Sequence, residues 1–169
     1  PGNIELFRNK NNTVSIDYQQ LLLTATLDET QLRTKISADS EGIASLQSEI
    51  NINVTPDRTI DGFINIGALN LEPFGNFFPR LATFTGNLSS NITLAGTLSS
   101  PDLSGNIQLD DGALELTSNP TLIDKINLGL ALNGQQAKVN GQWEMGDGQA
   151  SVDGYLYWPN GQVAGDLNI

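Results

Sequence analysis

Residues 83–116 alternate strictly between apolar and polar side chains. Leu88, Ile92, Leu94 and Leu98 occupy even positions, whereas the odd positions between them carry Ser, Asn, Thr and Ala. A repeat of two residues is the pattern of a β-strand with one apolar and one polar face, because successive side chains point to opposite sides of a sheet. This stretch therefore predicts a strand with one face in water and the other face covered.

The apolar side chains move from even to odd positions across residues 99–102, which include a proline and an aspartate. Leu103, Ile107 and Leu109 continue the apolar series after this point. A turn of even length produces this change of phase in a β-hairpin. We therefore expect a four-residue loop at 99–102, with Leu98 opposite Leu103 and all the aliphatic side chains on one face.

The same alternation recurs in the C-terminal part of the chain. Residues 126–169 form its most regular block, in which clusters of turn-forming residues at 133–136, 146–149 and 159–162 separate the alternating runs. Equal turns with a change of phase predict an antiparallel β-meander over 126–169.

Other turn signals divide the remainder of the chain. Clusters of Gly, Pro, Asp and Ser predict turns at residues 39–42, 55–58 and 110–112. Residues 19–20 lie between two alternating runs of opposite phase, which indicates either a hairpin turn or a bulge in one long strand. We expect a single β-rich domain over residues 1–169, which is a fragment of a longer repeat protein.

One short stretch changes its period from two to three and four, which predicts a helix over residues 72–81. Pro73 suits a first helical turn, whereas Gly75 and Pro79 keep the helix short. Its apolar residues either plug the mouth of a groove or form an ordinary helix face against the sheet edge. The candidate plug residues are Phe74, Phe77, Phe78 and Leu81.

The composition excludes several kinds of chemistry. Cysteine and histidine are absent, so the chain has no disulfide, no thiolate nucleophile, no imidazole base and no nitrogen- or sulfur-ligated zinc site. Asp110, Asp111 and Glu115 could form a weak calcium loop, but a turn explains the same residues. We therefore expect no enzyme, no metal and no cofactor. The formal net charge of -11 argues against binding to nucleic acid or to anionic membranes.

The row of Leu and Ile side chains on the predicted sheet must be covered, because burying each one contributes about 1.5–3 kcal/mol. The sequence lacks the helices that could cover it. Two arrangements remain open: a second sheet that closes a dry β-sandwich, or a curled sheet that leaves a slot for an apolar guest.

An ordered series of residues provides a resemblance. After residues 77–81, the chain from Gly86 to Leu114 reads G-x-L-x-x-x-I-x-L-x-G-T-L-x-x-P-x-L-x-G-x-I-x-L-D-x-G-x-L. This series resembles the recurring unit of the TamB family and, more distantly, of AsmA-like proteins, with a dense match over residues 69–116. The resemblance implies a mostly β fold, a taco-like, partly open, curled antiparallel sheet with a hydrophobic groove.

The resemblance also implies a place in the Gram-negative envelope. TamB is the inner-membrane-anchored subunit of the translocation and assembly module, spans the periplasm, and has a TamA-like outer-membrane barrel of the Omp85 type as its partner. Its implied roles are phospholipid transport to the outer membrane and the assembly of outer-membrane proteins and autotransporters.

We therefore expect a periplasmic segment whose groove shields phospholipid acyl chains or β-barrel client strands. The alternative is a non-catalytic structural spacer with a closed β-sandwich core, which tethers inner- and outer-membrane partners. The expected groove residues are Leu46, Ile50, Ile64, Leu88, Ile92, Leu94, Leu98, Ile107, Leu109, Leu128, Leu130, Val139, Val152 and Leu156.

Overall fold

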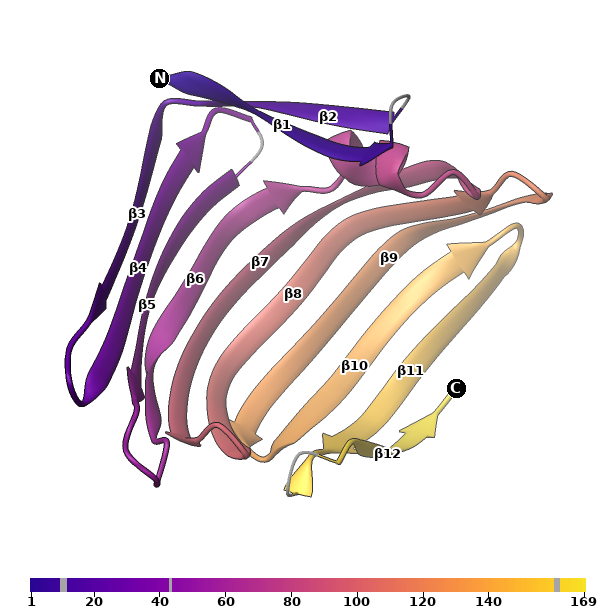
Figure 1. The fold of residues 1–169 in the computed structure, drawn as a ribbon. Coiled ribbons are helices and arrows are strands. Elements are labelled where there is room, and N and C mark those ends of the chain that lie inside the picture. The colour runs from indigo at the N-terminus through magenta and orange to yellow at the C-terminus, as the bar shows by residue number, and fades with distance from the viewer. Residues whose placement is uncertain (10–11, 43, 160–161) are drawn as a thin grey trace.

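The described residues form a ten-stranded antiparallel sheet and a separate two-stranded sheet (Figure 1). The computed structural model describes residues 1–9, 12–42, 44–159 and 162–169. Each strand of the large sheet pairs with its neighbours in the sequence, in the order β3 to β12. The strands are β3 (Gln20–Leu27), β4 (Gln31–Ser40), β5 (Ala44–Asn53), β6 (Ile60–Asn70), β7 (Leu81–Thr97), β8 (Ser100–Leu116), β9 (Asn119–Gly134), β10 (Gln136–Met145), β11 (Gly148–Tyr157) and β12 (Ala164–Asn168). The curled antiparallel fold expected from the sequence is confirmed.

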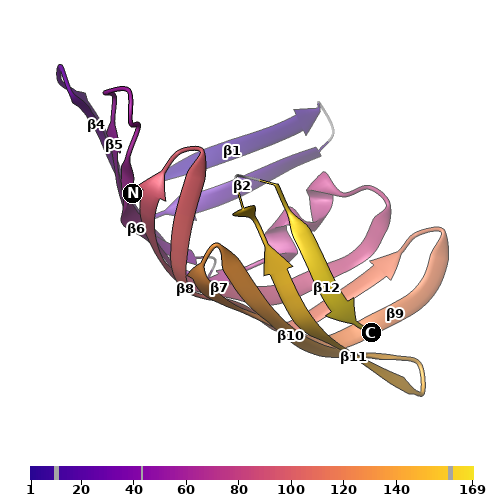
Figure 2. The same ribbon diagram turned by 90° about the horizontal axis from the view of Figure 1, so that it is seen from below.

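The two-stranded sheet consists of β1 (Gly2–Asn9) and β2 (Asn12–Tyr18) and lies beside one end of the large sheet, where β2 contacts β4 and the helix η1 (Figures 1 and 2). The chain passes from β2 to β3 at Gln19, whose backbone N–H donates to the carbonyl oxygen of Asp39 at 2.9 Å. Because β2 does not pair with β3, residues 19–20 form neither a hairpin turn nor a bulge in one strand. The chain changes sheets there.

Strand pairing places the apolar side chains of the ten strands on one face. Ile64 of β6 pairs with Ile92 of β7, for example, and Leu94 pairs with Leu103 of β8. The residues that are buried, among those described, all lie on this face: Ser40, Ser48, Gly86, Ser90, Gly112, Ala137, Val139 and Gly154. Side chains on the concave side of a curved sheet crowd together and bury one another. Because the buried residues all lie on the apolar face, this face is the inside of the curl seen in Figure 2. We call it the inner face, and the opposite, polar face the outer face.

Bulges in neighbouring strands bend the sheet. The register shifts between β6 and β7, and from β7 to β10, lie close to Ala68, Asp111 and Lys125. Each of these residues has a positive φ, of 44°, 51° and 48° respectively. A bulge adds a residue to one strand, bends that strand and increases its twist. The turn expected at 110–112 is therefore wrong, because β8 continues through these residues as a bulge.

The β7–β8 hairpin keeps its expected face but not its expected register. Thr97 pairs with Ser100, so the loop is two residues long and begins at Leu98. The backbone N–H of Ser100 donates to Thr97 Oγ1 at 3.1 Å and closes this tight turn. Leu103 consequently pairs with Leu94 rather than with Leu98. The register differs from the expected one by an even number of residues, so the aliphatic side chains still share a face.

The C-terminal meander shows a similar correction. Gln136 pairs with Asn133, which is the register expected for the turn at 133–136. Met145 pairs with Gly148, so the loop expected to contain four residues contains two. The shift is again even, and the apolar face is kept.

The helix is shorter than expected over 72–81. It is a 3₁₀ helix, η1 (Glu72–Phe77), with Pro73 in its first turn. The chain extends again at Leu81, which already pairs with Leu116 as the first residue of β7. The sheet's pairing therefore ends the helix early, because β7 needs these residues for its ladder with β8.

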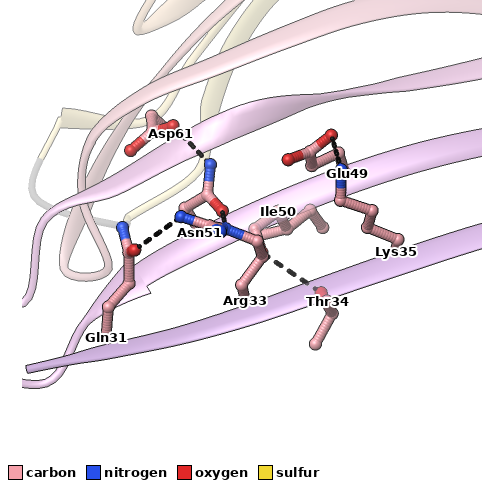
Figure 3. Close-up of polar contacts among 8 residues, drawn as sticks. All are labelled: Gln31, Arg33, Thr34, Lys35, Glu49, Ile50, Asn51 and Asp61. Atoms are coloured by element: carbon pink, nitrogen blue, oxygen red, sulfur yellow. Dashed lines mark hydrogen bonds and ion pairs between the residues drawn. The ribbon is translucent and has the colours of Figure 1, made fainter. Parts of the chain in front are cut away.

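Side chains on the outer face bind one another across the strands. Figure 3 shows Arg33 Nε donating to Asn51 Oδ1 at 3.0 Å, and Asn51 Nδ2 donating to Asp61 Oδ2 at 2.8 Å. Lys35 Nζ forms an ion pair with Glu49 Oε2 at 2.9 Å. Exposed pairs of this kind contribute about 0.2–1 kcal/mol each. They support the strand pairing without replacing a core.

Gly105 allows β8 to lie close to β7. Its φ is 127°, and a Cβ at this position would overlap the carbonyl oxygen of Asn91. We predict that Gly105→Ala lowers the free energy of unfolding by about 2 kcal/mol or more, because the methyl group meets backbone and the φ is strained. Urea denaturation followed by circular dichroism measures this loss.

Gly148→Ala is the matched control for this substitution. A Cβ there would lie 3.4 Å from the carbonyl oxygen of Met145, which is an ordinary contact. We expect Gly148→Ala to change stability little. Equal losses in the two variants would contradict the role assigned to Gly105.

Single cysteines distinguish the two faces, because the chain contains no other cysteine. Ile92 is half-buried on the inner face, whereas its neighbour Thr93 is exposed on the outer face. We predict that a charged maleimide modifies Thr93→Cys several-fold faster than Ile92→Cys, whereas a small uncharged reagent modifies both variants. Mass spectrometry over time measures the rates. An Ile92→Cys thiol that resists both reagents in the folded protein would show that the inner face is closed.

Candidate functional site: the inner face

The predicted groove residues lie on the inner face, with one correction. Leu98 lies in the β7–β8 turn and is 46% exposed, because the loop is shorter than expected. The others are placed on the inner face by their pairing: Leu46, Ile50, Ile64, Leu88, Ile92, Leu94, Ile107, Leu109, Leu128, Leu130, Val139, Val152 and Leu156. That these residues bind a guest stays a prediction.

The inner face also contains residues that the expected groove omitted. Ile36, Ile66, Leu103 and Leu132 belong to it by their pairing. The signal that finds them is the same alternation of period two, applied to every strand of the sheet rather than to selected positions.

Most of the inner face has no second layer over it in the described structure. Among the described residues, Ala137 and Val139 are the buried hydrophobic ones, and none of the large side chains is fully buried. The accessible surface is 10701 Å², whereas a folded monomer of 18.1 kDa exposes about 8,100 Å². The alternative of a closed, dry β-sandwich core is therefore wrong for this chain, and the curled sheet is the arrangement that the structure shows.

The inner face is free of charge. No strand residue that pairs on it, within the described ranges, is Asp, Glu, Lys or Arg. On the outer face, Lys125 Nζ and Glu144 Oε2 lie 2.7 Å apart, and this hydrogen bond lowers the pKa of Glu144 and raises the pKa of Lys125. In the β3–β4 turn, the backbone N–H groups of Thr30 and Gln31 lower the pKa of Asp28. The ionised groups thus lie away from the inner face.

A hollow of 520 Å³ lies over β8, β9 and β10. Its lining takes in residues of both faces of the sheet, with the amides of Asn106, Gln108 and Asn140 from the outer face. From the inner face it includes Ile107, Leu128, Leu130, Gly141 and Val152.

Aromatic residues gather near η1, at one end of the inner face. Phe74 and Phe77 belong to η1, and the ring of Phe78 lies 5.1 Å from the ring of Phe84 in β7, tilted by 58°. Leu81 begins β7. The structure therefore brings the expected plug residues to the same end of the sheet, where η1 contacts both β2 and β7. Their function as a plug stays a prediction.

Trp158 connects distant strands at the opposite end. Its indole Nε1 donates to the carbonyl oxygen of Pro101 at 3.1 Å, and its backbone N–H donates to the backbone carbonyl oxygen of Gln135 at 3.0 Å. Gln135 Nε2 in turn donates to Ser100 Oγ at 2.6 Å. Two strands separate β8 from β11 in the sheet, so this network stabilises the curl. The alternation places Trp158 on the inner face but does not reveal its partner.

The described residues contain no group of acidic side chains arranged to hold a metal ion. In the same part of the chain, no helix has the length and apolar character needed to cross a membrane.

Comparisons with known proteins agree on one family. The family described as "TamB, N-terminal domain" matches residues 1–109. The translocation and assembly module subunit TamB of Haemophilus influenzae is 22% identical over 149 residues, which are 88% of this chain and 12% of that protein. The chain thus spans a small part of that relative's length, and no solved structure matches it. Because the family match covers more than half of the chain, this chain belongs to the TamB family.

Proposed function

We propose that this chain is a segment of a periplasm-spanning envelope-biogenesis protein, and that its inner face is a hydrophobic groove that shields an apolar guest on the way to the outer membrane. The guest is a phospholipid acyl chain or a strand of an outer-membrane protein or autotransporter. One observation supports the proposal most directly. The inner face is apolar and uncharged, and most of it is uncovered in the described structure.

Family membership supports the cellular setting of this proposal. A relative is named as a subunit of a translocation and assembly module, which fits a non-enzymatic role in the envelope. By extension, the full-length protein is anchored in the inner membrane and has a TamA-like outer-membrane barrel as its partner. This segment lies in the periplasm between the two.

The mechanism is passive shielding from water. Each Leu or Ile side chain of the inner face that a guest covers contributes up to about 1.5–3 kcal/mol to the free energy of binding, because apolar surface is removed from water. The polar part of the guest stays at the open side of the curl, in contact with water. The groove needs no catalytic group for this task, because no covalent bond changes.

A structural spacer is the second candidate, and it lacks the closed core that was expected to support it. A spacer that tethers two partners would require only the strand pairing and the ends of the sheet. A spacer would have no use for the uncovered inner face, and such a face is a disadvantage because large exposed apolar surfaces promote aggregation. The groove therefore accounts for more of the structure than the spacer does.

Photo-crosslinking in living cells tests the proposal. A photoreactive amino acid replaces Leu94 on the inner face or, as the control, Thr93 on the outer face of the same strand. We predict lipid or client adducts at Leu94 and none at Thr93, as measured by mass spectrometry of the purified protein. Absence of adducts at both positions in a folded protein would favour the spacer.

A charge on the inner face provides an independent prediction. Leu94→Arg should leave the protein folded, because the guanidinium group can extend to the open side of the curl. It should lower guest crosslinking from a probe at Ile92 by roughly tenfold or more, since packing acyl chains over a charge costs more than about 1.4 kcal/mol. Thr93→Arg on the outer face is the control and should not reduce adduct formation. Loss of the folded circular dichroism spectrum in Leu94→Arg alone would instead indicate a sealed interior.

A further inference from the structure

Ser90 interrupts the apolar inner face of β7. It lies between Leu88 and Ile92 on the same face of the strand, and it pairs with Ile66 of β6 and Ile107 of β8. Its side chain is 8% exposed, and its Oγ has no hydrogen-bond partner. A hydroxyl group is therefore buried among aliphatic side chains without a partner.

Two other hydroxyl groups on the inner face, those of Ser40 and Thr34, have partners within the protein. Ser40 Oγ donates to the carbonyl oxygen of Asp17 at 2.5 Å, and Thr34 Oγ1 donates to the carbonyl oxygen of Ile50 at 3.3 Å. A buried polar group without a partner destabilises a fold, whereas alanine at the same place would not. Among the described residues, Ser90 Oγ is the fully buried side-chain polar atom that lacks a hydrogen-bond partner, and a bound molecule would explain it.

We propose that the Ser90 hydroxyl donates a hydrogen bond to an ester carbonyl of a glycerophospholipid, whose acyl chains lie on the inner face of β7 and β8 toward the turn at Leu98. This inference rests on the proposed function and selects the lipid as the guest. Ser90 marks the position of the glycerol ester region along the groove.

The distribution of polar groups favours a lipid over a client strand. An extended polypeptide carries a backbone donor and an acceptor at every residue, spaced by about 3.3 Å. Such a guest would require polar partners all along its path. Along β7, the inner face instead offers one fully buried, unpartnered hydroxyl followed by an aliphatic surface, which matches a molecule with polar ester groups at one place and hydrocarbon beyond them.

The inner face of β7 beyond Ser90 is also long enough for the acyl chains of a phospholipid. From Ser90 to Thr97 at the end of β7, an extended strand covers about 23 Å. The acyl chains of one bilayer leaflet occupy about 15 Å. The opposite direction leads to the register shift beside Gly86 and to the Phe78–Phe84 ring pair, which interrupt the aliphatic series. The chains are therefore placed toward the turn at Leu98.

The hydroxyl becomes accessible when its neighbours change rotamer. The side chains that surround Ser90 on the inner face are half-buried Leu and Ile residues, and no second layer holds them in place. A guest that separates these side chains reaches the hydroxyl and replaces their contacts with its own hydrocarbon.

The test uses the full-length protein in detergent micelles, with the photoreactive probe at Leu94. Adduct formation is compared between a diester phosphatidylethanolamine and a diether analogue with the same chains, which lacks the ester carbonyls. We expect the protein to favour the diester lipid by about 2- to 10-fold, the value of one net hydrogen bond. Ser90→Ala should abolish this preference, and Ser90→Thr, which keeps the hydroxyl group, should retain it.

The control is Ser89→Ala, the same substitution on the outer face of β7, which should retain the full preference. Ser90→Ala should also melt at the same temperature as the unchanged protein or higher, since it removes an unpartnered hydroxyl; a lower melting temperature would assign Ser90 a structural role and overturn the inference. Equal adduct yields from the two lipids in the unchanged protein would overturn the inference alone and leave lipid shielding intact. Absence of lipid adducts, or adducts with protein clients only, would overturn the choice of a lipid guest itself.

Discussion

The hydrogen-bonded pairing of neighbouring strands is the interaction on which the rest of this structure depends. An ordinary domain packs two layers around a shared core, and the core determines where each strand lies. Here the buried hydrophobic residues of the described structure are Ala137 and Val139, so no such core fixes the strands. Each strand of the large sheet instead pairs with its neighbours in the sequence, through loops as short as two residues. This local pairing keeps the aliphatic side chains on one face through the whole sheet.

Curvature then gives the two faces different environments. Bulges near Ala68, Asp111 and Lys125 bend neighbouring strands, and Gly105 permits a close approach that a larger residue would prevent. At one end, the hydrogen bond from Trp158 to Pro101 holds together strands that would be far apart in a flat sheet. The aliphatic side chains therefore lie inside the curl, and the ionised side chains lie outside it. The hydrophobic groove that we propose is a consequence of backbone geometry as much as of side-chain composition.

The sequence predicts the faces of this sheet better than it predicts the registers. Alternation of period two survives any even shift, so Leu103 lies on the inner face although its partner is Leu94 rather than Leu98. The prediction that Leu98 lies on the inner face is wrong, because loop length depends on local hydrogen bonds such as that between Thr97 and Ser100. The sequence predicts a turn rather than a bulge at 110–112, because the same residue types, Asp and Gly, favour both. The change of sheet at Gln19 and the partner of Trp158 depend on contacts between distant residues, which a local pattern does not contain. The sequence analysis does not single out Ser90, because a serine in an apolar series gains significance only from the burial of its hydroxyl group in the folded chain.

An uncharged inner face has a consequence for transport by the proposed mechanism. Aliphatic surface is non-directional in its effect, because each stretch covers the hydrocarbon of a guest about as well as the next. A guest could therefore move along the sheet without crossing a large electrostatic barrier, and it would gain no free energy from moving in one direction. Net movement would then have to come from differences at the two ends of the full-length protein, where partners supply or remove the guest. In this view Ser90 holds the ester groups of a lipid with the strength of one hydrogen bond, which is enough to position the molecule and weak enough to release it.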